Sequence, residues 1–418
     1  MKFLLKEKIL RSGIIFTALS FIVGLGNLLF SRLLNGAFTD SGEFGAAKNT
    51  TVFVGLLGLP LLIANTAVIH HIAHFRGMGN DGRLQGLLAG CRSFLLKLTI
   101  VACVLGVVLI QPLSRYFEIP RATLTLAALV SLLIGLWSGY ASALAQGMGW
   151  FKRLALIGLA SVAVKLAFVW IVTRRHPVAE TSVFAVAAGT LLNFTVFFWW
   201  RDLFKPGERI SPWDGAFFRY LALAAAAIAA QYCFTQSDSL VSLKYFSKAD
   251  QDAYAGAVSI ASALHLAVAP LLVVLFTARS SERSGRSLSG PLSLLLLYAA
   301  GLATGAFVLY FARDLAVKVF FTHPFPEASA MLPRLAVTMI FVGLIQALGM
   351  WALASHWLKM CVLYGVLGVA YWATLLTVGL TPGALLNVMP LISAAGFAVM
   401  LIAWLVALRH SRDPDASN

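Results

Sequence analysis

The chain of 418 residues is built around twelve apolar stretches of 20–28 residues each. A bilayer core about 30 Å thick needs around 20 helical residues per crossing, so each stretch is long enough to span a membrane. None shows the strict two-residue alternation of a barrel strand, and we therefore predict helices. The predicted spans are about 10–33, 49–74, 93–114, 121–148, 152–173, 181–200, 215–240, 254–278, 291–312, 331–353, 357–379 and 383–408.

The composition excludes a water-soluble fold. Hydrophobic residues make up 60% of the chain and charged residues 12%, against roughly 45–50% and 25% in soluble domains. The predicted loops are short, and no Walker loop, His-Glu-x-x-His or Gly-x-Ser-x-Gly motif is present. We therefore expect neither an enzyme nor an ATP-driven pump. The four cysteines show no paired spacing, so we predict no disulfide, no metal site and no cofactor.

Basic residues alternate between the predicted gaps. The two termini and the even-numbered gaps hold 20 of the 32 Lys and Arg residues, the odd-numbered gaps hold 11, and Lys165 lies inside a span. The positive-inside rule then places both termini in the cytoplasm. The excess of positive charge is explained by topology and by attraction to anionic lipid headgroups, so we expect membrane lipids as partners and no nucleic acid.

The basic loop 201–214 divides the chain into two predicted lobes of six helices, residues 1–200 and 215–418. An offset of 210 residues aligns Pro60-Leu61-Leu62 with Pro270-Leu271-Leu272, and in both halves the proline interrupts the second helix of the lobe. Matching prolines could serve as hinges for rocking lobes, as in transporters built from parallel repeats. Two tolerated kinks would give the same pattern.

Several motifs resemble those of a known superfamily. Ser31-Arg32-Leu33-Leu34, followed by Gly42-Glu43-Phe44-Gly45, resembles the end of helix one and the next loop in oligosaccharide-lipid flippases. Ala145-Gln146-Gly147 resembles their turn between helices four and five, and Ser237-Asp238-Ser239-Leu240 with Tyr254-Ala255 their passage from helix seven to eight. These proteins belong to the multidrug/oligosaccharidyl-lipid/polysaccharide exporter superfamily. The chain departs from them in a longer step after Leu34.

The resemblance implies an all-α, polytopic, MATE-like fold of twelve helices. It also implies a bacterial inner-membrane flippase for a lipid-diphosphate-linked oligosaccharide, working by alternating access, with polysaccharide polymerase or assembly proteins as further partners. Two alternatives stay open. One is a cation-coupled small-molecule or drug antiporter of the same superfamily, which should carry an intramembrane carboxylate. The other is a non-transporting membrane subunit of a polysaccharide assembly complex, whose cavity would be closed by bulky apolar side chains.

Ionisable groups inside a membrane helix are costly and normally face a cavity or a partner. Lys165 lies 12 residues beyond Arg153, hence roughly 18 Å deep and near the midplane. We predict that it lines a cationic cavity and contacts an anionic substrate, with a structural pair or snorkelling as the alternative. His265 lies at a similar depth in the other lobe. It is predicted to bind phosphate or to couple transport to protons, although a satisfied buried histidine would look the same.

Other polar residues complete the predicted pathway. Asp238, near the outer end of its helix, is a candidate for coupling or gating, or else an exposed helix-end carboxylate. Arg32 could guide a diphosphate. The intramembrane amides predicted to contact substrate are Asn27, Asn193 and Gln346, with Asn65 at a comparable depth and Gln146 near the inner edge; interhelical hydrogen bonding is the alternative. His70, His71 and His74 lack further ligands for zinc and are predicted to lie in the interface.

Overall fold

The computed structural model describes residues 2–38, 54–55, 58–116, 122–199, 215–280, 289–321 and 326–410. All regular elements in these ranges are helices, as predicted. They are α1 Lys2–Ala37, α3 Leu59–Met78, α4 Asp81–Tyr116, α5 Ala122–Gly147, α6 Phe151–Phe168, η1 Val169–Thr173, α7 Ala179–Leu191, η2 Leu192–Phe194, α8 Thr195–Trp199, α9 Gly215–Tyr245, α10 Lys248–Ser280, α11 Ser289–Phe311, α12 Arg313–Phe320, α13 Pro326–Ala354, α14 Leu358–Val378 and α15 Pro382–His410.

Within the described ranges, ten helices are long and apolar enough to cross a membrane, and the count rises to eleven if the two parts of the bent helix α10 form one span. The second predicted span, 49–74, coincides in part with α3; its residues 49–53 and 56–57 lie outside the described part of the chain. Two predicted boundaries are wrong. The first apolar span is Ile15–Ala37 rather than 10–33, and α4 starts at Asp81 rather than 93. Helices continue past the apolar window because their backbone hydrogen bonds do not depend on the lipid.

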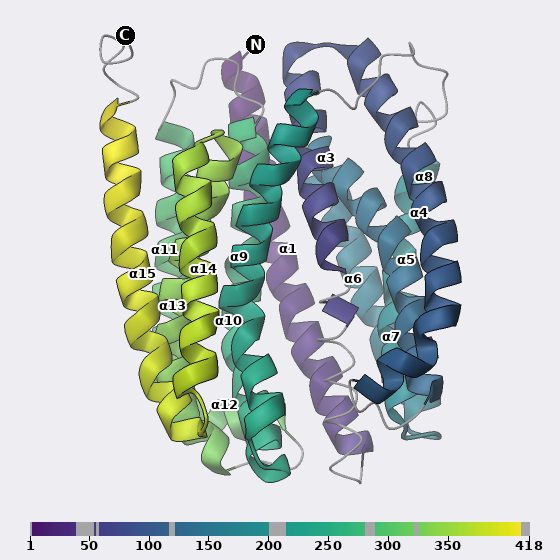
Figure 1. The fold of residues 1–418 in the computed structure, drawn as a ribbon, viewed down its shortest axis with the longest axis vertical. Coiled ribbons are helices and arrows are strands. Elements are labelled where there is room, and N and C mark those ends of the chain that lie inside the picture. Colours follow the sequence, from purple (N-terminus) through teal and green to yellow (C-terminus); the bar gives the residue numbers. More distant parts are fainter. Residues whose placement is uncertain are drawn as a thin grey trace.

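The helices form two groups. In Figure 1, α3 to α8 lie on one side, α9 to α15 lie on the other, and α1 runs obliquely between them, with both chain termini at the same end. Helix α1 packs against both α6 and α10, and α3 packs against α9. The N-terminal helices (α1 to α8) and the C-terminal helices (α9 to α15) therefore meet along α1, α3, α9 and α10. The dividing loop 201–214 lies outside the described residues.

Three turns at the end of the molecule that holds the termini share one backbone pattern. After α3, α5 and α13, a residue with positive φ closes the helix: Gly79 at 70°, Gly149 at 66° and His356 at 57°. At each turn this residue donates to the carbonyl three residues earlier, and the next residue donates to the carbonyl five residues before it. This is the Schellman arrangement, which strongly favours glycine. His356 is the exception of the three.

The two matched prolines have different surroundings. Pro270 lies inside α10, which bends by 43° between the stretches ending at His265 and starting at Ala267. The bend lies four residues before the proline because its ring removes that hydrogen bond and crowds the carbonyl there. Pro60 occupies the first turn of α3, where a missing N–H costs nothing. Whether either position acts as a hinge stays a prediction.

Candidate functional site

A cavity of about 880 Å³ lies where the two groups of helices meet. Its walls come from α1, α3, α5 and α7 on one side and from α9, α10 and α13 on the other. The polar side chains in its described wall are amides and hydroxyls: Asn27, Ser31, Asn65, Thr66, Ser142, Gln146, Ser182, Gln231, Tyr232, Thr235, Gln236, Ser239, Ser259 and Ser262.

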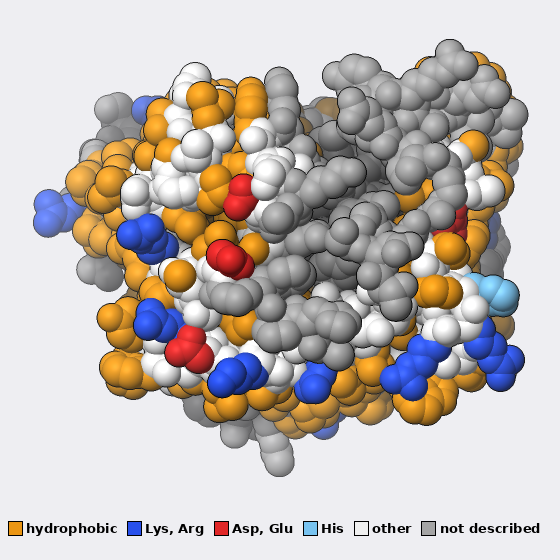
Figure 2. All heavy atoms as spheres, turned by 90° about the horizontal axis from the view of Figure 1, so that it is seen from below, with side chains coloured by type: hydrophobic (Ala, Val, Ile, Leu, Met, Phe, Trp, Pro, Cys, Tyr) orange, Lys and Arg blue, Asp and Glu red, His pale blue; other side chains and the backbone are white. Residues whose placement is uncertain are grey.

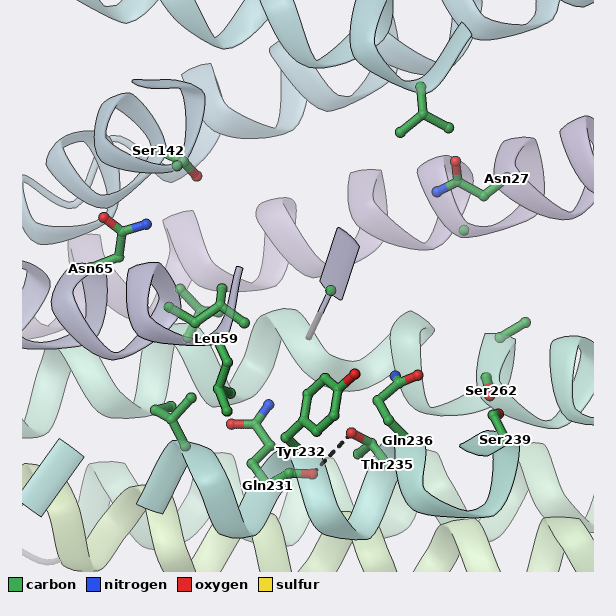
Figure 3. A pocket seen from close by; sticks show the side chains of 18 of the residues that line it. Asn27, Leu59, Asn65, Ser142, Gln231, Tyr232, Thr235, Gln236, Ser239 and Ser262 are labelled. Carbon is green, nitrogen blue, oxygen red and sulfur yellow. Dashed lines mark hydrogen bonds between the residues drawn. The ribbon is translucent and has the colours of Figure 1, made fainter. Parts of the chain in front are cut away.

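The C-terminal helices supply the densest polar face. Figure 3 shows Gln231, Tyr232, Thr235, Gln236 and Ser239 following one side of α9 toward the open space. Thr235 Oγ1 also donates to the carbonyl of Gln231 at 2.9 Å, which satisfies its hydroxyl proton along the helix. Spacings of one, three and four residues place these side chains on neighbouring positions of one helix face. The part of α9 before Gln231 is rich in alanine.

The described wall carries no formal charge. Its members are apolar, amide or hydroxyl side chains, and no Lys, Arg, Asp or Glu is among them. The predicted cationic wall is therefore wrong for the described part of the cavity. Of the residues predicted to bind substrate, Asn27 lies in this wall, whereas Lys165 stands one layer behind it.

Lys165 reaches the cavity through Asn27. Its Nζ donates a hydrogen bond to Asn27 Oδ1 at 3.2 Å, joining α6 to α1. The lysine stem lies against Gly189 of α7, where a Cβ would come within 2.9 Å of Lys165 Cγ. A π-helical turn, Val169–Thr173, starts four residues beyond the lysine, and such turns are frequent at functional sites. The structure thus places the cation of Lys165 beside a neutral wall, paired with an amide of that wall.

His265 belongs to the core of the C-terminal helices. Its Nδ1 is 3.2 Å from Tyr298 Oη, and it also interacts with the side chain of Gln346. Gln346 is itself only 6% exposed. Neither His265 nor Gln346 belongs to the described cavity wall. The structure brings these two predicted residues together, at the bend of α10, but away from Asn27 and Lys165.

Two further predicted residues also lie outside the described wall. Asn193 Nδ2 donates to Ser138 Oγ at 2.7 Å and so ties η2 to α5. Arg32 donates from Nη1 to the carbonyl of Val319 at 2.6 Å, which links α1 to α12 at the end opposite the termini. Figure 2 shows this end, where basic and acidic side chains are mingled around the rim. Arg32 is therefore a contact between the two groups of helices.

Asp238 is buried rather than exposed. Its side chain is 1% accessible, and its Oδ2 accepts a hydrogen bond from Tyr254 Oη at 2.8 Å. The interpretation as an exposed helix-end carboxylate is wrong, because α9 continues to Tyr245 and packs against α14 and the start of α10. Ser239, the next residue, lies in the cavity wall. A buried carboxylate thus stands directly behind the polar face of α9.

The polar face of α9 is the main feature that the sequence reasoning missed. Its members are common residues without charge, and no single one is unusual in a membrane helix. The available signal was their spacing: Gln231, Thr235, Gln236 and Ser239 recur on one side of an otherwise Ala-rich span. A periodic polar stripe within an apolar helix indicates a face turned toward water or a partner.

Solved structures with a similar fold include several transporters. A Vibrio cholerae MATE transporter, VcmN carrying a D35N substitution, matches with a TM-score of 0.74 and 14% identity over 97% of this chain and 98% of that one. The eukaryotic MATE transporter AtDTX14 matches with a TM-score of 0.69 and 15% identity over 99% of both chains. A MOP-superfamily transporter from Pyrococcus furiosus gives 0.67 and 12% over 96% of both. No family model and no curated protein matches the sequence. The chain has the MATE fold.

Proposed function

We propose that this protein is an alternating-access membrane transporter and that it flips a lipid-diphosphate-linked oligosaccharide across the membrane. The observation that carries the proposal is the chemistry of the cavity: a neutral wall of amides and hydroxyls with one lysine paired to it. The MATE fold supports transport, and the substrate class is inferred from the wall.

An amide- and hydroxyl-rich wall suits a sugar. Asn and Gln side chains offer both donors and acceptors, and Ser, Thr and Tyr hydroxyls can serve as either. Sugar hydroxyls need the same dual capacity from their partners. The cavity of about 880 Å³ lies in the upper part of the roughly 300–1,000 Å³ range of ligand pockets. Phe30, Tyr232 and Phe276 add flat surfaces for the apolar faces of sugar rings.

Lys165 supplies the positive charge that a diphosphate requires. It is hydrogen-bonded to Asn27 of the wall, so its ammonium group lies one side chain away from the cavity. A single Lys is a compact charge that can follow a phosphate as it passes. The remaining contacts to the headgroup would come from the uncharged wall, which binds without holding the substrate too tightly to release.

A cation-coupled antiporter is the second candidate, and Asp238 favours it. A buried carboxylate next to a cavity residue is a suitable place for a proton or a small cation. For an organic cation as cargo, however, the carboxylate should face the cavity, and the described wall contains none. We therefore assign Asp238 to ion coupling of the same transporter. The polar cavity argues against a non-transporting subunit.

The test is leaflet transfer in proteoliposomes. Purified protein is reconstituted with a fluorescent lipid-diphosphate-linked oligosaccharide, and transfer is followed by access of an external glycosidase. The native protein should transfer the substrate, and Lys165→Ala should slow transfer at least tenfold. Lys97→Ala is the matched control, since Lys97 lies exposed on α4. Equal transfer by Lys165→Ala and native protein would remove the assignment of Lys165.

Substrate class is tested in the same vesicles. A lipid diphosphate without sugar and an organic cation replace the oligosaccharide in two parallel reactions. Transfer that needs the sugar supports the proposal, because the amide and hydroxyl wall then contributes to recognition. Uptake of the organic cation without transfer of the lipid-linked sugar would establish the antiporter instead.

A further inference from the structure

A group of histidines joins the two groups of helices at the end of the molecule that holds the termini. His70 and His74 come from α3, and His356 from the turn between α13 and α14. His70 is 3% exposed and therefore lies among neighbouring side chains; its predicted depth at the membrane interface stays a prediction. We call the contact between His70 and His356, with Ser280 and Tyr220, the histidine latch. It connects an N-terminal helix to three parts of the C-terminal group.

The hydrogen bonds of the latch depend on protonation. His70 Nε2 and His356 Nε2 are 3.0 Å apart, and His70 Nδ1 is 2.9 Å from Ser280 Oγ. Two imidazole nitrogens can share one proton, one ring donating and the other accepting. A single added proton is tolerated, because His70 can then donate to both Ser280 and His356. A second added proton places two N–H groups and two positive charges face to face, and the contact is lost.

Every element packed around the latch contributes a polar or titratable group. On α3, His74 stacks on His70 with ring centroids 6.0 Å apart, and His71 lies edge-on at 5.3 Å. On α9, Tyr220 stacks on His70 at 4.0 Å. On α10, Arg279 donates from Nε to Ser355 Oγ, next to His356. These described neighbours are neutral or basic, so each added proton raises the repulsion.

The backbone of His356 is unusual for its position. The equivalent places in the turns after α3 and α5 are occupied by Gly79 and Gly149, which adopt positive φ without strain. A side chain at φ 57° is unfavourable unless its surroundings hold it there. The turn therefore keeps a strained residue whose ring reaches across to His70.

The latch lies next to the cavity wall at this end. Ile69, Phe276 and Met350 are cavity-wall residues, and Ile69 precedes His70 in α3. The ring of Phe276 lies 6.4 Å from the ring of His70, between the latch and the cavity. Separation of His70 from His356 would thus open a path from the cavity toward the end that carries both termini.

We propose that the histidine latch is a proton-binding site that controls opening of the cavity at the end carrying the termini: neutral imidazoles hold this end closed, and protonation of both His70 and His356 releases it. This inference names the proton as a ligand of the transporter. It rests on the proposed alternating-access function, but the opening itself can be measured without any substrate.

The sign of the pH effect follows from the surroundings of His356. Partial burial lowers the pKa of His356, and the nearby His74 lowers it further. In the open state the imidazole would return toward its usual pKa of about 6.5. The closed state therefore binds fewer protons and has its full stability above about pH 6.5, which it loses as the pH falls through that value. The ratio of closed to open molecules should change by up to about tenfold per pH unit for each proton bound.

The test measures the distance between the two groups of helices in nanodiscs. The four native cysteines are replaced by Ala or Ser, and spin labels are attached at Met78→Cys and Leu358→Cys, which are 41% and 59% exposed. Distances are recorded by electron paramagnetic resonance from pH 8 to pH 5.5. We expect one short distance at pH 8 and a growing longer population at low pH. Distances that do not respond to pH would overturn the proposal.

Two substitutions at His356 separate protonation from folding. His356→Asn cannot gain a proton and suits positive φ, because Asn adopts this backbone region more readily than other residues; it should stay closed at every pH. His356→Arg carries one permanent charge, which neutral His70 can still accept a hydrogen bond from; protonation of His70 alone should then release the contact, so opening should need one proton instead of two. His176→Asn, exposed before α7, is the matched control and should respond like the native protein. A native pH response in His356→Asn would overturn the proposal.

Failure of this inference is distinguishable from failure of the proposed function. A pH-dependent distance together with no oligosaccharide transfer would keep the latch and reject the substrate. Transfer by native protein together with a distance that ignores pH would keep the transporter and reject the latch.

Discussion

The Nζ of Lys165 donates a hydrogen bond to Oδ1 of Asn27 at 3.2 Å, and this contact brings the charge of α6 to the wall of the cavity. The amide carries out two functions at once. It provides the partner that a lysine needs inside a membrane, and it presents its own polar group to the cavity. Loss of either residue should therefore affect the other.

Replacing Asn27 by Ala should reduce transfer of the lipid-linked sugar nearly as much as Lys165→Ala does. Without the amide, the lysine lacks its acceptor in the wall, and loss of a partner of a buried charged group costs roughly 1–3 kcal/mol. Both transfer and melting temperature should be measured. Trp137→Phe is the control, since it removes another interhelical hydrogen bond, to Thr99 Oγ1 at 3.0 Å. Equal transfer by Asn27→Ala and the control Trp137→Phe would contradict the role of Asn27.

Gly189→Ala should destabilise the N-terminal helices by roughly 1–3 kcal/mol, the usual cost of an added methyl group in a packed core. A Cβ there would lie 2.7 Å from Ser161 Oγ, 2.8 Å from Ser161 O and 2.9 Å from Lys165 Cγ. The change in thermal unfolding should be compared with that of Gly135→Ala. A Cβ at Gly135 meets no atom within 4 Å. A melting temperature for Gly189→Ala equal to that of Gly135→Ala would show that α7 can move away from α6.

The helices could be predicted from the sequence because each depends on a local property. A run of about 20 apolar residues is sufficient for a crossing, whatever surrounds it. The start of α4 at Asp81 could not be predicted in this way, because its first turns lie beyond the apolar run and are helical through backbone hydrogen bonds. The 43° bend of α10 was indicated by Pro270, whereas the proline of α3 lies in a first turn where it bends nothing.

Depth within the membrane was a poor guide to the candidate site. Lys165 and His265 were placed at similar depths, yet Lys165 contacts the cavity wall and His265 contacts Tyr298 in the core. The depth of a residue is fixed by its position along its helix. Whether its side chain faces the cavity depends on how that helix is rotated about its own axis. That rotation depends on packing against helices distant in sequence. The histidine latch could not be predicted from the sequence for the same reason, since His70 and His356 are 286 residues apart.

Making the face of α9 apolar should impair transfer without unfolding the protein. Gln231→Leu and Gln236→Leu each remove donors and acceptors from the cavity wall. If the wall binds sugar hydroxyls, transfer should fall about tenfold for each lost pair of hydrogen bonds, which corresponds to about 1.4 kcal/mol. Transfer of the lipid diphosphate without sugar should change much less. Thr374→Val on α14, which removes an exposed hydroxyl, is the control. An equal loss for both substrates would contradict sugar recognition by this face.

Asp238→Asn should remove the dependence of transport on an ion gradient. The carboxylate is 1% exposed and accepts from Tyr254 Oη at 2.8 Å, and an amide oxygen can accept the same bond without carrying charge. The variant should therefore fold normally, and its transfer rate should be equal with and without a proton or sodium gradient. Tyr254→Phe keeps the charge but removes its donor, and should instead lower stability by about 1.5–3 kcal/mol. If Asp238→Asn still responds to the gradient as the native protein does, the coupling ion binds elsewhere, and the pH response of the histidine latch becomes the remaining place to look for it.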